Sequence, residues 1–135
     1  MPSAYRSKQM QRYKSYALGQ WIDGEGVETS LFNAITGEQI GELSSKGFDY
    51  AAILNYGRTT GGKVLRKMTF QERGRMLKAL ALYLLERKEK YYQVSAWTGA
   101  TRVDSWIDIE GGIGNLFANA SLRRQFPDLP YYVDG

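Results

Sequence analysis

The sequence predicts an α+β fold in which a short antiparallel β-meander is followed by about four helices. Up to residue 43, short segments alternate polar with apolar residues, which is the period of a strand. From residue 44 onward, apolar residues recur every three to four positions, which is the period of an amphipathic helix. Glycine-containing segments that suit turns separate these stretches.

Three strands are expected before residue 44. The first covers 16–22 and ends at 23–26, where Gly24 and Gly26 suit a turn into the next strand. The second covers 28–35 and breaks at Thr36 and Gly37, and the third covers 38–43. Short strands joined by such turns are typical of a meander.

A helical stretch begins near residue 48 and is interrupted or ended by glycines at 57, 61 and 62. A second helix follows Thr69, which with Glu72 forms the pattern of a capping box. Its apolar face is expected to lie on the core. The residues of that face are Phe70, Leu77, Leu80, Ala81, Leu84 and Leu85.

Two more helices complete the pattern. The third covers 89–97 and should stop at Gly99, because glycine readily takes the left-handed conformation that ends many helices. The fourth starts near Asp104, which, like Ser105, can cap it. Its apolar stripe consists of Trp106, Ile109, Ile113, Leu116, Phe117 and Ala120.

The composition excludes several kinds of chemistry. The 135 residues contain no cysteine and no histidine, so thiolate nucleophiles, serine–histidine dyads and the commonest zinc ligands are absent from the sequence. We therefore predict no catalytic and no metal-binding residue in this chain. No apolar run approaches the ~20 residues of a membrane helix, and no signal peptide is visible, so a cytoplasmic protein is expected.

The net charge of +4 is assigned to a basic, flexible leader at 1–14. It carries Arg6, Lys8, Arg12 and Lys14 and no acidic residue, whereas 14 basic and 14 acidic residues follow from position 15 onward. Because the charges from position 15 onward sum to zero, we do not expect nucleic acid as a partner.

Two glycine-rich segments resemble phosphate-binding motifs only in part. The segment 57–63 matches a phosphate-binding loop, but Val64 stands where the magnesium-binding hydroxyl belongs, so we interpret it as a loop that interrupts a helix. Gly112 and Gly114 lack the third glycine of a dinucleotide fingerprint, since Phe117 occupies its place.

With Gly111, these two glycines lie inside the fourth helix, where they admit either a close neighbouring backbone or a bulky ligand. Close packing is the favoured interpretation. The nearby carboxylates of Asp104, Asp108 and Glu110 are interpreted as cap and solvent-face residues.

Several segments together resemble the N-terminal part of aldehyde dehydrogenases. These are 19–24, 32–40 with Ala34 in place of the usual proline, 69–73, and Thr98-Gly99 followed by Ala100 and Thr101 where Lys-Pro is usual. The segments 98–102 and 104–114 closely resemble the subgroup that acts in aerobic phenylacetate degradation, in which the dehydrogenase is fused to an enoyl-CoA-hydratase-like domain. Dehydrogenases of benzoyl-CoA oxidation share part of this pattern.

The resemblance implies a segment of a larger α/β fold. It covers 15–126, and 127–135 looks like the truncated start of the next element. In the family, the nucleophilic cysteine, the general-base glutamate, the oxyanion-hole asparagine and the NADP- or NAD-binding strands all lie downstream. The resemblance therefore implies that this segment alone is inactive and has no cofactor-binding residues, and that the full-length parent binds NADP or NAD. Its expected partners are the remainder of the dehydrogenase chain and, in the parent, further copies of it.

The resemblance also implies a position for the fourth helix, since the matching helix of the family borders the substrate entrance. Gly111, Gly112 and Gly114 are then expected to widen the entrance for a CoA-thioester substrate. Two alternatives remain: a noncatalytic module that associates with a full-length dehydrogenase, and a small nucleotide-binding protein that uses 57–63.

Overall fold

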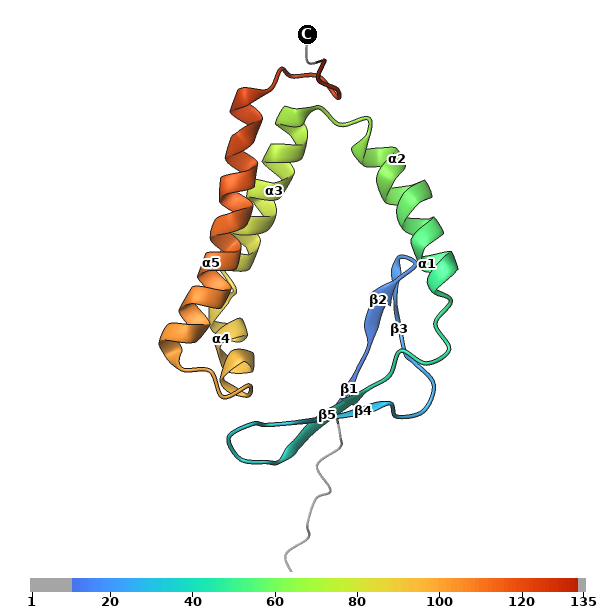
Figure 1. Ribbon diagram of the computed structural model, residues 1–135, viewed down its shortest axis with the longest axis vertical. Coiled ribbons are helices and arrows are strands. Elements are labelled where there is room, and N and C mark those ends of the chain that lie inside the picture. The colour runs from blue at the N-terminus through green and yellow to red at the C-terminus, as the bar shows by residue number, and fades with distance from the viewer. Residues whose placement is uncertain (1–10, 134–135) are drawn as a thin grey trace, which may run out of the picture. The chain divides into compact units, whose positions relative to one another are not determined.

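The computed structural model describes residues 11–133, and the chain divides into two units between Ile53 and Leu54 (Figure 1). The first unit contains five short strands, and the second contains most of the helical residues. The α+β class predicted from the sequence is confirmed. Residues 1–10 of the predicted leader lie outside the described residues.

A three-stranded mixed sheet has β5 (Gln39–Leu43) at its centre. On one side β4 (Thr29–Phe32) pairs with it antiparallel, and on the other β1 (Arg12–Tyr13) pairs with it parallel. Gly41 permits this arrangement, because a Cβ atom there would overlap the ring of Tyr13. The predicted third strand is confirmed, whereas β1 lies within the range assigned to the leader.

The segment predicted as one strand over 16–22 is a hairpin, so that prediction was wrong. Strands β2 (Ser15–Ala17) and β3 (Gln20–Ile22) pair antiparallel around Leu18 and Gly19, whose φ angles of 54° and 80° form the tight turn. Tyr16 and Trp21 lie opposite each other with ring centroids 5.3 Å apart. Leucine seldom takes a positive φ, so the sequence carried only a weak signal for this turn.

The predicted break at Thr36 and Gly37 is confirmed. The side chain of Asn33 accepts hydrogen bonds from the amides of Ile35 and Thr36 at 2.9 and 3.3 Å, and Gly37, with a φ of 72°, donates to the Asn33 carbonyl at 2.8 Å. An asparagine that satisfies the amides that follow it is a common way to close such a turn.

The glycines at 57, 61 and 62 do not interrupt the first helix, contrary to the prediction. Helix α1 (Tyr50–Tyr56) continues into a π-helical turn, Gly57–Gly61, and then into α2 (Gly62–Leu65). The amide of Gly62 donates to the carbonyl of Gly57, five residues earlier. Each glycine costs a helix only about 1 kcal/mol relative to alanine, which weakens a helix without forbidding it.

In the second unit, α3 (Phe70–Leu85) and α5 (Arg102–Ser121) lie side by side and run antiparallel, with α4 (Lys88–Ala96) packed against α5 (Figure 1). Gly74 and Ala81 of α3 and Ile113 and Ala120 of α5 are buried. A Cβ atom at Gly74 would come within 2.9 Å of the Ala120 carbonyl oxygen. The contact between the two helices therefore depends on a glycine.

Capping boxes begin both long helices. Thr69 accepts from the Glu72 amide at 3.2 Å and its own amide donates to the Glu72 carboxylate at 2.8 Å, as predicted. Helix α5 starts at Arg102, close to the predicted position, but its cap is Thr101, so the prediction that Asp104 or Ser105 caps it was wrong. Asp104 is the third residue of that helix and completes the box. The predicted end of α4 is confirmed, since Gly99 has a φ of 84°.

The residues after α5 fold back onto the start of α3. A short 3-10 turn, Leu122–Gln125, leads to Phe126, whose ring stacks on Phe70 at 4.6 Å between centroids. The amide of Phe70 donates to the carbonyl of Leu129 at 3.0 Å. These contacts close one end of the α3–α5 pair.

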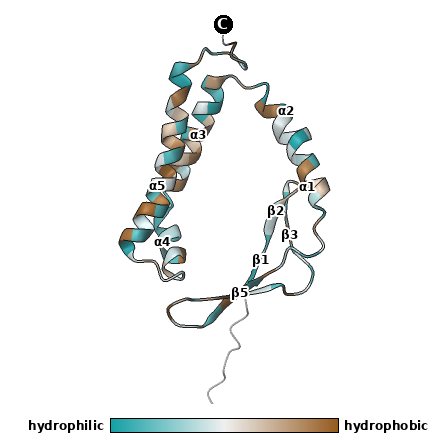
Figure 2. Cartoon of the chain, in the orientation of Figure 1, coloured by the Kyte–Doolittle hydropathy of each residue, from teal (hydrophilic) through white to brown (hydrophobic). Residues whose placement is uncertain are grey.

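Hydrophobic and hydrophilic residues are interleaved along α5 (Figure 2). Three large apolar side chains near its start are exposed, namely Val103, Trp106 and Ile107. Of the predicted apolar stripe, Ile113 and Ala120 are buried, while Trp106 is 56% exposed. None of the described helices has the length and apolar character needed to cross a membrane.

Candidate functional site

The three glycines of α5 form an open face. Gly111, Gly112 and Gly114 are all exposed, and a Cβ atom built on any of them meets no heavy atom within 4 Å outside its own stretch of helix. Close packing, the favoured interpretation from the sequence, is therefore wrong within the described chain. The three glycines lower helix stability by roughly 1 kcal/mol each without any packing contact in return.

One of these glycines lines an apolar groove between the three helices of the second unit. The groove has a volume of about 430 Å³. Gly112 forms part of its wall, with Leu84 from α3 and Tyr91 from α4. Its other lining residues are Ile109, Ile113 and Leu116 of α5. With scarcely any polar atom to offer, the groove suits an aliphatic or aromatic group.

A polar cluster fixes the turn of α5 that precedes the glycines. Glu110 accepts a 2.6 Å hydrogen bond from the Tyr92 hydroxyl and a 2.9 Å ion pair from Lys88, both at the same oxygen. These partners, Tyr92 first, lower the pKa of Glu110, and the same hydrogen bond raises the pKa of Tyr92. Glu110 is thus a structural anion that joins α4 to α5, and its interpretation as a solvent-face residue was wrong.

Arg102 extends the same junction between α4 and α5. Its guanidinium lies 3.7 Å from the centroid of the Tyr92 ring and pairs with Glu89 at 3.2 Å. Nearby, the hydroxyl of Ser105 donates to that of Ser95 at 2.8 Å. Because every one of these groups is engaged within the chain, the junction orients α5 and offers no free acid or base.

Asp104 completes the capping box of α5, whereas the sequence had predicted it as the cap itself. Its carboxylate accepts from the Thr101 hydroxyl at 2.6 Å and from the Thr101 amide at 3.2 Å. Both hydrogen bonds, that of the hydroxyl first, lower the pKa of Asp104. Among the described residues, no group of three or more acidic side chains is placed to hold a metal ion.

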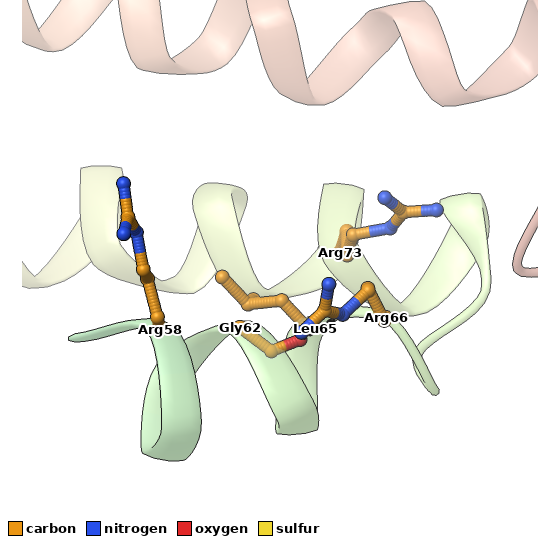
Figure 3. Close-up of a pocket in the computed structure, with 5 residues that line it drawn as sticks. All are labelled: Arg58, Gly62, Leu65, Arg66 and Arg73. Atoms are coloured by element: carbon orange, nitrogen blue, oxygen red, sulfur yellow. Dashed lines mark hydrogen bonds between the residues drawn. The ribbon is translucent and has the colours of Figure 1, made fainter. Parts of the chain in front are cut away.

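A basic pocket of about 440 Å³ lies in the second unit, between α3 and the helical stretch formed by the π-helical turn and α2 (Figure 3). Arg58, Arg66 and Arg73 line it together with Gly62 and Leu65. Figure 3 shows Arg58 at one end of the pocket and Arg66 and Arg73 near each other at the opposite end. No carboxylate lines the pocket.

The balance of basic and acidic residues from position 15 onward gives no sign of this pocket. Locally the charge is uneven, since residues 50–71 contain Arg58, Lys63, Arg66 and Lys67 and no acidic residue. The segment 57–63, which matches a phosphate-binding loop in part, is helical. Its amides serve helical hydrogen bonds and do not form the cradle that a phosphate-binding loop requires.

The chain matches no protein-family model. It is 38% identical over 100 residues to 3,4-dehydroadipyl-CoA semialdehyde dehydrogenase of Aromatoleum evansii. Over these residues the chain is similar to part of that dehydrogenase. The matched residues make up 73% of this chain and 19% of that dehydrogenase, so the chain spans about a fifth of its length.

The resemblance to dehydrogenases of CoA-linked semialdehydes, predicted from the sequence, is confirmed by this relative. The similarity covers a part of that dehydrogenase, while the open glycine face and the basic pocket are features of this chain's own structure. Neither contains a thiol or an imidazole, because the sequence has no cysteine or histidine.

Proposed function

We propose that the chain is a structural layer of a dehydrogenase that oxidises a CoA-linked semialdehyde, with NADP or NAD as acceptor. In that reaction the aldehyde and one water give a carboxylate, a hydride passes to the nicotinamide, and two protons are released. The 38% identity to the Aromatoleum evansii dehydrogenase supports this proposal.

We assign no catalytic step to this chain alone. Oxidation through a covalent intermediate requires an activated nucleophile, which in the related family is a cysteine, and the sequence contains none. The carboxylate of Glu110 is also unsuited to proton transfer, because Tyr92 and Lys88 hold it as an anion. The proposed contribution of this chain is therefore to shape the substrate entrance and to bind the substrate.

The observation that carries the proposal is the open glycine face of α5. Three glycines lower the stability of this helix, yet no neighbour within the described chain requires them to be small. We infer that a group from outside the described chain occupies the space that these glycines leave open. A bulky substrate that passes along Gly111, Gly112 and Gly114 meets this requirement, and a CoA thioester is such a substrate.

Aromatic catabolism, in the cytoplasm, is the setting we propose for the enzyme, with a semialdehyde of phenylacetate degradation as the substrate. The remainder of the dehydrogenase would cover the exposed apolar side chains of Val103, Trp106 and Ile107. Further copies of the same enzyme complete the proposed assembly.

A noncatalytic module that binds a full-length dehydrogenase is the second candidate. The same three exposed side chains favour it, because contiguous apolar surface of this kind is typical of interfaces. The two candidates differ in whether this chain can replace the matching segment of a working enzyme or only attach to it.

Segment exchange tests the proposal. The matched residues of the Aromatoleum evansii dehydrogenase are replaced by those of this chain, and reduction of NADP or NAD is followed with the CoA semialdehyde. We expect the exchanged enzyme to turn over while the isolated chain does not. An exchanged enzyme that folds, as judged by circular dichroism, but is inactive would contradict the proposal. Co-purification of the isolated chain with the intact dehydrogenase would support the second candidate instead.

A further inference from the structure

Three positive charges share one pocket without a negative partner. Arg58, Arg66 and Arg73 line it, and none of the ion pairs found among residues 11–133 involves any of them. Like charges brought together repel one another, which disfavours the empty pocket and favours an anion within it. At about 440 Å³ the pocket is within the usual size of ligand sites.

Two of the guanidinium groups are already oriented by the backbone. Arg66 donates through Nε to the carbonyl of Gly62 at 3.1 Å. Arg73 donates through Nη2 to the carbonyl of Pro130 at 3.0 Å and lies 4.4 Å from the centroid of the Phe70 ring. Each retains N–H groups for a ligand, and a side chain that is ordered beforehand loses less entropy on binding.

The π-helical turn supplies a second, independent indication of a site. Such turns are rare and occur frequently at functional sites. This one, Gly57–Gly61, contains Arg58, and the helix leads directly from it to Gly62 and Arg66. Gly62 also lines the pocket, and a Cβ atom there would lie at ordinary contact distance, 3.5 Å, from Nη2 of Arg66.

We propose that this pocket binds the phosphorylated adenosine diphosphate end of CoA. Guanidinium groups pair with phosphate oxygens through two parallel hydrogen bonds, and three spaced guanidiniums match a ligand with several phosphates better than a single anion. This inference rests on the proposed function for its choice of CoA. NADP carries the same chemistry, with its extra phosphate on the other ribose hydroxyl.

Calorimetric titration of the isolated chain tests the inference. The probes are CoA, dephospho-CoA, NADP and inorganic phosphate. We expect CoA to bind more tightly than dephospho-CoA and far more tightly than phosphate. Arg58→Gln and Arg66→Gln should each weaken CoA binding about tenfold, because each removes a charge-assisted contact. Arg75→Gln, an exposed arginine of α3 outside the pocket, serves as the matched control.

Equal losses in Arg75→Gln and the pocket variants would overturn the inference, since they would indicate general attraction to a basic surface. So would phosphate binding as tight as that of CoA, or no CoA binding by a chain that is folded by circular dichroism. If NADP binds instead of CoA, and Arg58→Gln and Arg66→Gln weaken that binding, the pocket recognises the phosphorylated adenosine diphosphate group of NADP. These titrations need no turnover, so an inactive segment exchange and a failed titration contradict different proposals.

Discussion

The hydroxyl of Tyr92 in α4 donates a 2.6 Å hydrogen bond to Oε1 of Glu110 in α5, immediately before Gly111. Lys88 reaches the same oxygen at 2.9 Å. The turn of α5 that begins the glycine face is therefore held from α4 by one carboxylate. This contact links the stability of the helical unit to the position of the proposed substrate wall.

Glu110→Gln should remove part of the acid sensitivity of the chain. The hydrogen bonds from Tyr92 and Lys88 lower the folded-state pKa of Glu110. Glu110 therefore contributes its full stabilisation of the fold at pH values above the ordinary pKa of glutamate. That contribution is lost as pH falls through the lowered pKa. Thermal unfolding is followed by circular dichroism from neutral to acidic pH. The variant should have a lower Tm than the unaltered chain at neutral pH, and its Tm should fall less as the pH is lowered.

Asp108→Asn is the control for this prediction, because it removes an exposed carboxylate from the same helix. An acid profile of Glu110→Gln that is as steep as that of the unaltered chain would contradict the role given to Glu110.

Thr101→Ala should destabilise the helical unit by about 1 kcal/mol, the usual effect of losing a side-chain cap. The variant loses the hydroxyl that accepts from the Asp104 amide and donates to its carboxylate. Thr101→Ser keeps the hydroxyl and should remain near the unaltered chain in urea unfolding. Equal losses in both variants would mean that the methyl group, and not the cap, matters.

Two glycine-to-alanine changes should have opposite signs. Gly74→Ala places a Cβ atom within 2.9 Å of the Ala120 carbonyl oxygen and against the Arg123 side chain, so we expect a loss of about 1–3 kcal/mol. Gly114→Ala meets no atom within 4 Å and should gain about 0.5–1 kcal/mol from helix propensity. The free energies of unfolding in urea check both. Destabilisation by Gly114→Ala would contradict an open glycine face.

Local side-chain chemistry made parts of the fold predictable. The pair Thr69 and Glu72 satisfies helix amides within four residues of sequence, and Gly99 ends α4 through its own conformational freedom. Such signals need no knowledge of distant contacts. The cap of α5 was mispredicted because Thr101, Asp104 and Ser105 are all residue types that commonly cap helices.

Long-range contacts were not predictable in the same way. Strand β1 exists because it pairs with β5, whose residues lie about 30 positions later, and Gly41 leaves room for Tyr13. The basic pocket likewise joins Arg58 and Arg66 to Arg73 across a turn. The glycines of α5 were visible as a motif, but their open surroundings became apparent only in the structure.

The most direct test of the proposed role is Gly111→Leu in the exchanged dehydrogenase, with Gly111→Ala as the matched small change. A leucine on the open face should obstruct a bulky substrate and leave a small one free. We predict that the KM for the CoA semialdehyde rises about tenfold while kcat, and the KM for a small aldehyde, stay unchanged. Equal effects on the two substrates, or none on either, would contradict the account.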